Sequence, residues 1–381
     1  MQVKVNNLSQ TFGKKTQHTF KALENVSASF EQGEYVGIIG QTGSGKTTFI
    51  EHLNALHLTD GGSVEWAFDS EIQDRKEKFS KLSYYGKPYT KEFSDLKSQK
   101  ITKLKREYKK FKENAKKSKT QSYSEIKEFK KYIKDQIKQA KKDCKWEIKN
   151  NAASFKEQKQ LWKSNKRSLK HIKKIRQNLG IVFQFAEYQL FKETVEQDIA
   201  FGPISHGLDP KVAIERAKEY LEIVGLGPEF LKRSPAELSG GQKRRVAIAG
   251  ILAMEPKFLV VDEPIAGLDP VGIHEILEIF KKLNEKGITI INVSHDLDNI
   301  LKYASRVIMF KDGKIVNDDK TYEVLKDVKL LDEYQLQPPK LFRITSKLEQ
   351  RGLKVPKVTS IEDLAAFLNS YMKSKKGGKN A

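Results

Sequence analysis

The sequence has a single cysteine, Cys144, among its 381 residues. One thiol cannot form a disulfide within the chain, which excludes a disulfide-stabilised scaffold and indicates a reducing compartment. Long hydrophobic runs are also absent, because Phe258–Val261 and Ile288–Ile291 are only strand-sized, far below the ~20 residues that span a bilayer. No charged and then apolar segment opens the sequence, so no secretory signal is expected. These absences predict a soluble or peripheral protein, for which any role in transport would need membrane partners.

Acidic residues are scarce in one part of the chain only. Residues 70–175 contain 34 Lys and Arg against 13 Asp and Glu, whereas the other 275 residues contain 36 of each. The net charge of +21 therefore belongs to one basic segment, and the remainder is a neutral globular body.

Outside the basic segment, strand patterns alternate with helix patterns. A helix is expected over Thr47–Leu58. A second helix, which ends at Gly287, is expected from an apolar stripe at helical spacing: Ile273, Ile276, Leu277, Phe280 and Leu283. The expected strands are Val3–Phe12, Ala28–Phe30, Tyr35–Ile39, Ser63–Phe68, Leu179–Phe183 and Ile288–Val293. This alternation predicts an α/β protein with a doubly wound parallel sheet, whose binding loops lie at the carboxyl ends of the strands.

The basic segment carries two apolar stripes at helical spacing, separated by a capping box at Ser122–Glu125. The first stripe consists of Phe93, Leu96, Leu104, Tyr108 and Phe111, and the second of Ile126, Phe129, Ile133, Ile137, Ala140, Cys144 and Ile148. Two such helices predict a helical hairpin or antiparallel coiled coil. Because apolar residues are sparse, partial disorder is the alternative.

Gly40–Thr47 has the sequence GQTGSGKT, a complete P-loop placed after a predicted strand and before a predicted helix. Its glycines let backbone N–H groups converge on phosphates at the positive end of a helix dipole. Lys46 is expected to reach the β- and γ-phosphates, and the Thr47 hydroxyl to bind Mg²⁺. The predicted nucleotide contacts here are Gly40, Gln41, Thr42, Gly43, Ser44, Gly45, Lys46, Thr47 and Thr48.

Further candidate catalytic residues follow other predicted strands. Asp262 and Glu263 end an apolar strand; Asp262 is suited to hold Mg²⁺ and Glu263 to polarise the attacking water. Gln184 can contact both the Mg²⁺ and that water. His295 follows the strand Ile288–Val293 and can contact the γ-phosphate.

The pentapeptide Leu238–Gln242, LSGGQ, lies between the P-loop and the paired acids. It indicates an ATPase that works as a face-to-face dimer, in which each subunit lends this segment to the ATP of its neighbour. The nucleotide contacts expected from it are Ser239, Gly240, Gly241 and Gln242. Asp269, in Gly267–Pro270, is expected to contact nucleotide at the dimer seam and to couple the two sites.

This order of motifs resembles the ATP-binding cassette superfamily. Val182–Phe191 and Ser239–Gly250 narrow the resemblance to the ATPases of energy-coupling factor transporters, and to the second of their paired ATP-binding subunits. The resemblance implies a P-loop NTPase cassette with a mixed or parallel sheet core, an antiparallel β subdomain and a helical signature subdomain. The expected domains are a cassette over 1–69 and 176–322, a basic, mostly helical insert over 70–175, and a C-terminal helical tail over 323–381.

The same resemblance implies ATP and Mg²⁺ as cofactors and three kinds of partner. These are a second ATP-binding subunit that completes a heterodimer, a transmembrane coupling subunit, and a substrate-specific membrane subunit. The implied function is ATP hydrolysis that powers uptake of vitamins or transition-metal ions, by a peripheral protein on the cytoplasmic side of the cell membrane.

Several positions depart from the family pattern. Phe12 stands where the family usually stacks a Tyr on adenine, and a phenyl face can still stack. Ala186 replaces the usual Pro after Gln184, and Ile265 replaces a usual Thr. None of these changes removes a phosphate or metal contact. The large departure is the insert at 70–175, where the family has a short link.

Three interpretations of the basic insert stay open: contact with anionic lipid head groups, contact with nucleic acid, and a solvated Lys-rich insert without a charged partner. Lys greatly outnumbers Arg, which disfavours nucleic acid. The alternative function is a DNA-handling cassette ATPase with a coiled-coil insert. In that class the coil separates the glutamine loop from the signature, whereas Gln184–Leu238 is uninterrupted here. A translation-type protein would carry two cassettes, but the sequence has one P-loop.

Overall fold

The computed structural model describes residues 1–13, 19–57, 59–67, 81–85, 90–118, 123–150 and 172–377. The chain divides into two compact units. The first combines Met1–Tyr84 with Ser168–Ala381 and contains every predicted nucleotide contact, and the second is Tyr85–Arg167. None of the helices that the structure describes is both long and apolar enough to cross a membrane.

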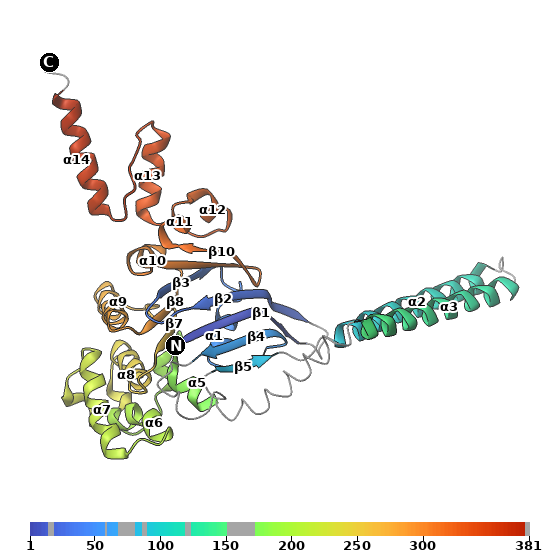
Figure 1. The fold of residues 1–381 in the computed structure, drawn as a ribbon, viewed down its shortest axis with the longest axis horizontal. Helices are drawn as coiled ribbons and strands as arrows, with labels where there is room; N and C mark the ends of the chain where they lie inside the picture. The colour runs from blue at the N-terminus through green and yellow to red at the C-terminus, as the bar shows by residue number, and fades with distance from the viewer. Residues whose placement is uncertain are drawn as a thin grey trace. The chain divides into compact units, whose positions relative to one another are not determined.

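A six-stranded sheet forms the centre of the first unit, in the order β10-β9-β3-β8-β7-β6. Strands β10, β3, β8 and β7 are labelled in Figure 1. All neighbouring pairs are parallel except β9 with β10, which form an antiparallel hairpin. The strands are β3 (Tyr35–Gly40), β6 (Leu179–Val182), β7 (Phe258–Asp262), β8 (Thr289–Val293), β9 (Arg306–Lys311) and β10 (Lys314–Lys320). The predicted parallel sheet is therefore confirmed, with one antiparallel edge strand.

Both faces of this sheet are buried. Along β7, Phe258 and Val260 belong to one hydrophobic cluster, whereas Leu259 and Val261 belong to another. Because successive side chains of a strand point to opposite faces, a strand buried on both sides becomes a continuous apolar run. This is why the strand-sized runs are the most hydrophobic segments of the sequence.

A four-stranded sheet in the order β2-β1-β4-β5 contributes to one of the two clusters. Its strands are β1 (Gln2–Phe12), β2 (Phe20–Phe30), β4 (Gly61–Ala67) and β5 (Lys81–Tyr85), with β1 antiparallel to β2 and β4. Val3 pairs with Phe30 on one side and Trp66 on the other, and all three are buried. The strand β5 lies inside the range 70–175, which the sequence predicts to be mostly helical.

Helix α1 follows the P-loop but is shorter than predicted. It spans Lys46–Leu53 and does not reach Leu58. Ala55 has a positive φ of 57°, which no α-helix accommodates. The indole N–H of Trp66 donates to the Leu53 carbonyl at 2.6 Å, so the end of the helix is fixed against the antiparallel sheet.

Helices α6, α7 and α8 pack on one another to form the helical part that carries LSGGQ (Figure 1). In α7, Asp209 caps the N-terminus and Pro210 occupies the first turn, where its missing N–H costs no helical hydrogen bond. In α9, the predicted stripe is confirmed, because Ile276, Leu277, Phe280 and Leu283 are buried. The remaining bounds are α5 (Ile172–Asn178), α6 (Val195–Ser205), α7 (Pro210–Ile223), α8 (Gly240–Leu252), α9 (Pro270–Glu285) and α10 (Leu297–Tyr303).

The C-terminal region is helical and shares the larger hydrophobic cluster through buried residues such as Leu331, Phe342 and Leu364. Its helices are α11 (Thr321–Leu325), α12 (Val328–Glu333), α13 (Lys340–Gln350) and α14 (Ile361–Gly377).

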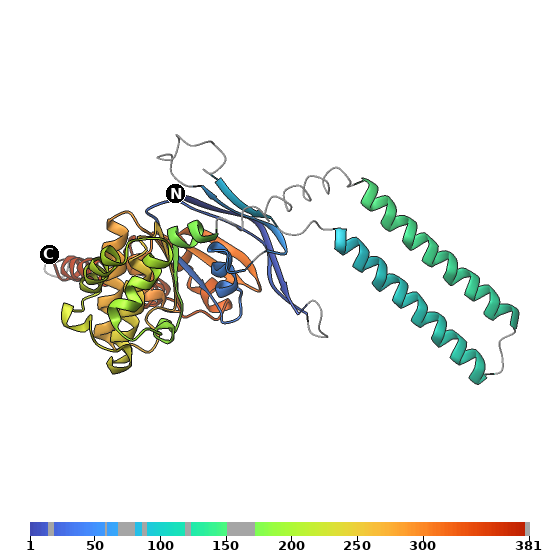
Figure 2. The same cartoon turned by 90° about the horizontal axis from the view of Figure 1, so that it is seen from below.

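The second unit contains two long helices, α2 (Thr90–Ser118) and α3 (Tyr123–Asn150), which lie side by side (Figure 2). Phe129 stacks on Phe111 at 4.2 Å and on Tyr108 at 6.5 Å between ring centroids. Ile133 and Ala140 are buried on the same stripe of α3. The predicted helical hairpin is present, although Ser122 of the predicted capping box lies outside the described residues.

Phe280→Ala is expected to lower the free energy of unfolding by about 3–5 kcal/mol, because it opens a cavity beneath a fully buried ring. Val271→Ala provides the control, since Val271 lies on the same helix but is 65% exposed; its effect should stay within about 0.5 kcal/mol. Chemical denaturation of the purified chain measures both. Equal losses in the two variants would contradict the assigned packing of α9.

Candidate nucleotide-binding site

The P-loop connects β3 to α1 and has backbone angles that require glycine. Gly40 has a φ of 147°, and a Cβ there would lie 2.4 Å from the Phe310 carbonyl oxygen. Gly45 has a φ of 101° and precedes the first turn of α1. Within the loop, the Ser44 N–H donates to the Gln41 carbonyl at 3.1 Å. The loop is therefore a fixed turn with the N-terminus of a helix at its base, which is the arrangement that binds anions.

Lys46 lies inside this loop. Its ammonium donates to the carbonyl oxygens of Gly40 and Gln41, each at 2.8 Å. Burial lowers the pKa of Lys46, while the charges of Glu263 and Asp262 act to raise it. Within the part of the chain that the structure describes, the Ser44 Oγ is buried without a hydrogen-bond partner. The loop thus holds a cation and a buried hydroxyl without a described hydrogen-bond partner beside the N-terminus of α1.

The Thr47 hydroxyl donates to Asp262 Oδ2 at 3.0 Å. Burial raises the pKa of Asp262, and this hydrogen bond together with the charge of Lys46 lowers it. A hydroxyl and a carboxylate held this close fit Mg²⁺, which takes few protein ligands beside phosphate oxygens and water. When bound, Mg²⁺ would neutralise charge on the phosphates.

Glu263 follows the end of β7 with a positive φ of 48°, and its N–H donates to the Val293 carbonyl at 2.9 Å. Burial and the neighbouring charge of Asp262 raise the pKa of Glu263 to about 7. His295 Nε2 lies 3.3 Å from Glu263 Oε1. That oxygen is nevertheless buried and accepts no hydrogen bond from the described residues. A carboxyl in this state can accept a proton from water near neutral pH.

Gln184 follows β6, the neighbour of β7, and its side chain is exposed at the carboxyl edge of the sheet. Its backbone carbonyl accepts a hydrogen bond from Arg244 at 3.3 Å. Gln184 is thus next to the paired acids in strand order but takes no part in the hydrogen bond between Thr47 and Asp262.

The LSGGQ segment begins helix α8 with a complete capping box. Ser239 Oγ accepts from the Gln242 N–H at 3.3 Å, and Gln242 Oε1 accepts from the Ser239 N–H at 3.0 Å. Ser239 and Gly240 are exposed. Asp269 is exposed as well and caps α9, accepting from the Gly272 N–H at 2.7 Å. These residues are accessible to a molecule outside the chain.

Phe12 lies at the end of β1 and is 37% exposed. Its ring packs against His57 in a T-shaped pair, with 5.6 Å between the ring centroids. Thr42 is exposed in the P-loop, whereas Thr48 is half-buried in the first turn of α1. Contact of these three residues with a nucleotide stays a prediction.

The structure also shows a P-loop contact that the sequence analysis missed. Gln41 Nε2 donates to the Tyr334 carbonyl at 3.0 Å and to Gln335 Oε1 at 2.9 Å. Gln335 has a positive φ of 52° in the segment after α12. No local sequence signal joins positions so far apart in the chain, and only the folded C-terminal region reveals the contact.

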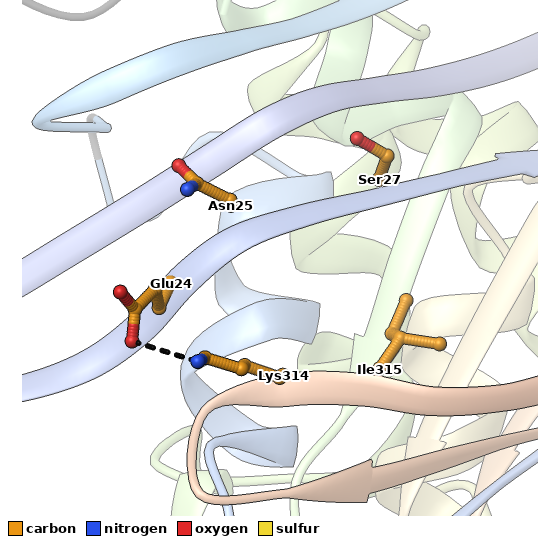
Figure 3. Close-up of a pocket in the computed structure, with 5 residues that line it drawn as sticks. All are labelled: Glu24, Asn25, Ser27, Lys314 and Ile315. Atoms are coloured by element: carbon orange, nitrogen blue, oxygen red, sulfur yellow. Dashed lines mark ion pairs between the residues drawn. The ribbon is translucent and has the colours of Figure 1, made fainter.

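A separate cavity of about 400 Å³ lies between β2 and β10 (Figure 3). It is lined by Glu24, Asn25, Ser27, Lys314 and Ile315. Glu24 and Lys314 face each other across it at 3.3 Å, so its two charged groups neutralise each other. None of the predicted nucleotide contacts lines this cavity, and the P-loop is the stronger candidate site.

Comparison with known proteins agrees with the class that the fold and the P-loop define, an ATP-binding cassette. The family described as ABC transporter matches residues 23–145 and 148–266. The energy-coupling factor transporter ATP-binding protein EcfA2 of Mycoplasmopsis synoviae (strain 53) is 45% identical over 375 residues, which cover 98% of this chain and 97% of that protein. EcfA2 of Mesomycoplasma hyopneumoniae (strain 7448) is 38% identical over 370 residues, 97% of each chain.

Solved structures show the same fold. CbiO1 from Clostridium perfringens, part of the ABC transporter complex cbiONQ, is 25% identical with a TM-score of 0.54, over 90% of this chain and 98% of that one. The dimeric cassette MJ0796 bound to ADP and Pi is 23% identical with a TM-score of 0.53, over 84% of this chain and 98% of that one. The chain therefore belongs to the ABC transporter family, and within it to the ATP-binding proteins of energy-coupling factor transporters. The family predicted from the motifs is confirmed.

Glu263→Gln is expected to bind ATP normally but to hydrolyse it about 10²–10⁴-fold more slowly, because the amide cannot accept a proton from water. The rate is measured with a partner cassette whose own catalytic glutamate is replaced, so that all phosphate comes from the P-loop of this chain.

Glu219→Gln is the control, since Glu219 is an exposed carboxylate on α7. It should leave both binding and turnover unchanged. Near-normal turnover in Glu263→Gln would defeat the assignment of Glu263 as the base.

Proposed function

We propose that this chain is the Mg²⁺-dependent ATP-hydrolysing subunit of an energy-coupling factor importer, acting in a heterodimer with a second ATP-binding subunit. The observation that carries the proposal is the grouping of Lys46, Thr47, Asp262 and Glu263 at one edge of the sheet. It combines a buried cation, a hydroxyl–carboxylate pair suited to Mg²⁺ and a carboxyl of raised pKa. Phosphoryl transfer depends mainly on such positioning and charge neutralisation.

Each of these residues has a distinct role in the proposal. Lys46 binds the β- and γ-phosphates, and Thr47 with Asp262 holds Mg²⁺ with help from Gln184. Glu263 accepts the proton of the attacking water, and His295, 3.3 Å from its carboxylate, contacts the γ-phosphate. Phe12 supports the adenine.

The second nucleotide of the dimer is bound by exposed groups of this chain. Ser239 and Gly240 lie at the N-terminus of α8, where free N–H groups and the helix dipole favour a phosphate. Asp269 is exposed at the start of α9 and meets the partner at the dimer seam. This exposure supports a composite site, in which ATP lies between two subunits.

An exposed aromatic group supports docking to a transmembrane coupling subunit. Its members follow Gln184 in the chain or lie on α6, and their exposed fractions are 51% for Phe185, 83% for Tyr188, 62% for Phe191 and 44% for Phe201. Lys192 lies over the rings of Phe191 and Phe201, 5.0 and 4.8 Å from their centroids. Exposed apolar rings of this kind mark protein interfaces. We call this set the docking group.

The same proposal places the chain on the cytoplasmic side of the cell membrane, held there by its membrane partners. From the family resemblance we also propose a substrate-specific membrane subunit as a partner, and vitamins or transition-metal ions as the transported substrate. The DNA-handling alternative is not favoured, because relatives that match nearly the whole chain, insert included, are energy-coupling factor proteins.

Purification of the tagged chain from mild detergent is expected to recover a second ATPase and a polytopic membrane protein. Tyr188→Ala should reduce recovery of the membrane protein while leaving ATP binding intact, because Tyr188 is the most exposed ring of the docking group. Tyr132→Ala is the control, since it removes a ring that is 56% exposed on the hairpin. Recovery of DNA and a nuclease would overturn the proposal.

The helical hairpin is proposed to bind anionic lipid head groups. Helices α2 and α3 together carry 20 Lys and Arg against 9 Asp and Glu. Basic residues near an anionic membrane surface gain about 1 kcal/mol each, so part of this excess suffices to hold the hairpin there. The apolar stripes of the two helices pack against each other, and the exposed faces of the helices carry lysines.

Replacing five exposed lysines with Gln is expected to lower cosedimentation of the full chain with phosphatidylglycerol vesicles by about tenfold or more. The positions are Lys105, Lys109, Lys130, Lys134 and Lys138. Arg at the same five positions should retain binding, and neutral phosphatidylcholine vesicles should bind neither form. Unchanged sedimentation of the Gln variant would contradict the lipid role.

A further inference from the structure

Arg244 is a buried guanidinium outside the phosphate contacts, only 4% exposed. Its Nε and one Nη2 hydrogen donate to the carboxylate of Glu187 at 3.2 and 3.1 Å. Nη1 donates to the carbonyl oxygens of Pro264 and Ala266 at 3.2 and 2.6 Å, and Nη2 also donates to the Gln184 carbonyl at 3.3 Å. A guanidinium has five N–H donors, and all five are used.

The acceptors of Arg244 come from two loops only. One loop follows β6 and carries Gln184, and the other follows β7 and begins directly after Glu263. Since a guanidinium is planar and rigid, acceptors on both of its edges are held at fixed positions relative to each other. Arg244 therefore holds the Gln184 backbone at a fixed position relative to the backbone that follows Glu263. The side chains of Gln184 and Glu263 are the two proposed to contact the attacking water.

Arg244 is also connected to the signature serine. It lies in α8, the helix that Ser239 caps. Hydrogen bonds along the helix make Ser239 and Arg244 parts of one rigid element. A contact that shifts Ser239 therefore shifts the guanidinium, and with it the acceptors of both loops.

We propose that Arg244, paired with Glu187, is a positioning residue that couples the partner's nucleotide at Ser239 to the alignment of Gln184 and Glu263. This inference rests on the proposed cassette dimer. It explains why the position needs Arg: Lys would keep the charge but offers three donors from a single atom and could not engage both loops.

The test uses Arg244→Lys in a complex whose partner cassette lacks its own catalytic glutamate. Turnover per bound ATP should fall about 10- to 100-fold, the loss that a small misplacement of catalytic groups causes. The KM for ATP should change by no more than about twofold, because the P-loop is untouched. Glu187→Gln keeps the side-chain shape and should give a smaller loss of the same kind, and the double variant should be no worse than Arg244→Lys alone.

A second measurement tests whether Arg244 affects hydrolysis at the partner's nucleotide site, to which Ser239 contributes. In a complex that carries Glu263→Gln in this chain and an intact partner, only the partner's P-loop hydrolyses ATP, and Ser239 serves that site. Adding Arg244→Lys should slow this hydrolysis as well. An unchanged rate there would show that Arg244 acts only within its own subunit and would overturn the proposal.

Arg245→Lys is the matched control. Arg245 is the next residue of α8 and pairs with Glu275, whose side chain is 45% exposed. It should behave as wild type in both measurements. Three results would reduce Arg244 to a general structural role. They are an equal loss in Arg245→Lys, additive losses in the variant that combines Arg244→Lys with Glu187→Gln, and a fall in turnover matched by lost ATP binding.

Wild-type hydrolysis with and without the partner tests the dimer separately. A rate that does not depend on the partner would contradict the dimer, whatever the Arg244 variants show.

Discussion

The site depends on the parallel alignment of four strands. β3, β8, β7 and β6 are neighbours in that order, so their carboxyl ends lie along one edge of the sheet. The P-loop, His295, Glu263 and Gln184 follow these strands in turn. A slip of one residue in a pair would move its groups by ~3.3 Å and reverse every side chain. The 3.0 Å contact between Thr47 and Asp262 would not survive such a slip, and the two apolar faces of the sheet prevent it.

At this edge of the sheet, Lys46 attracts the carboxylates of Asp262 and Glu263, but burial of the three groups costs solvation free energy. Burial lowers the pKa of Lys46 and raises the pKa of Asp262 and Glu263. The attraction between Lys46 and the two carboxylates opposes both effects, whereas the charge of Asp262 adds to the effect of burial on Glu263. The carbonyls of Gly40 and Gln41 bind the ammonium in the loop. Because these carbonyls are weaker partners than phosphate oxygens, the ammonium can turn to an incoming nucleotide with little rearrangement of the backbone. The same desolvation leaves Glu263 poised between its two protonation states.

Most of the cassette core and the position of the P-loop between a strand and a helix could be predicted from the sequence, because their signals are local. The P-loop is one continuous segment, and β7 is an apolar run that ends in two acids. The parts that could not be predicted depend on distant contacts. The end of α1 depends on the backbone of Ala55 and on Trp66, the strand β5 lies in a Lys-rich segment, and Gln41 meets the C-terminal region. The acceptors of Arg244 likewise lie in two loops that are far from it in the sequence, and no periodic pattern links these positions.

The buried pair of Arg244 and Glu187, like the charges at the edge of the sheet, is costly to remove from water. A buried ion pair adds little net stability, since the desolvation of both charges offsets their attraction, and apolar residues of similar volume often serve a core as well. Apolar side chains, however, cannot direct three backbone carbonyls. The loops after β6 and β7 carry Gln184 and Glu263, the two residues that are proposed to face one water. A charged group with five directed donors holds the two loops together, and it lies on the helix that begins at Ser239, the residue proposed to meet the partner's nucleotide.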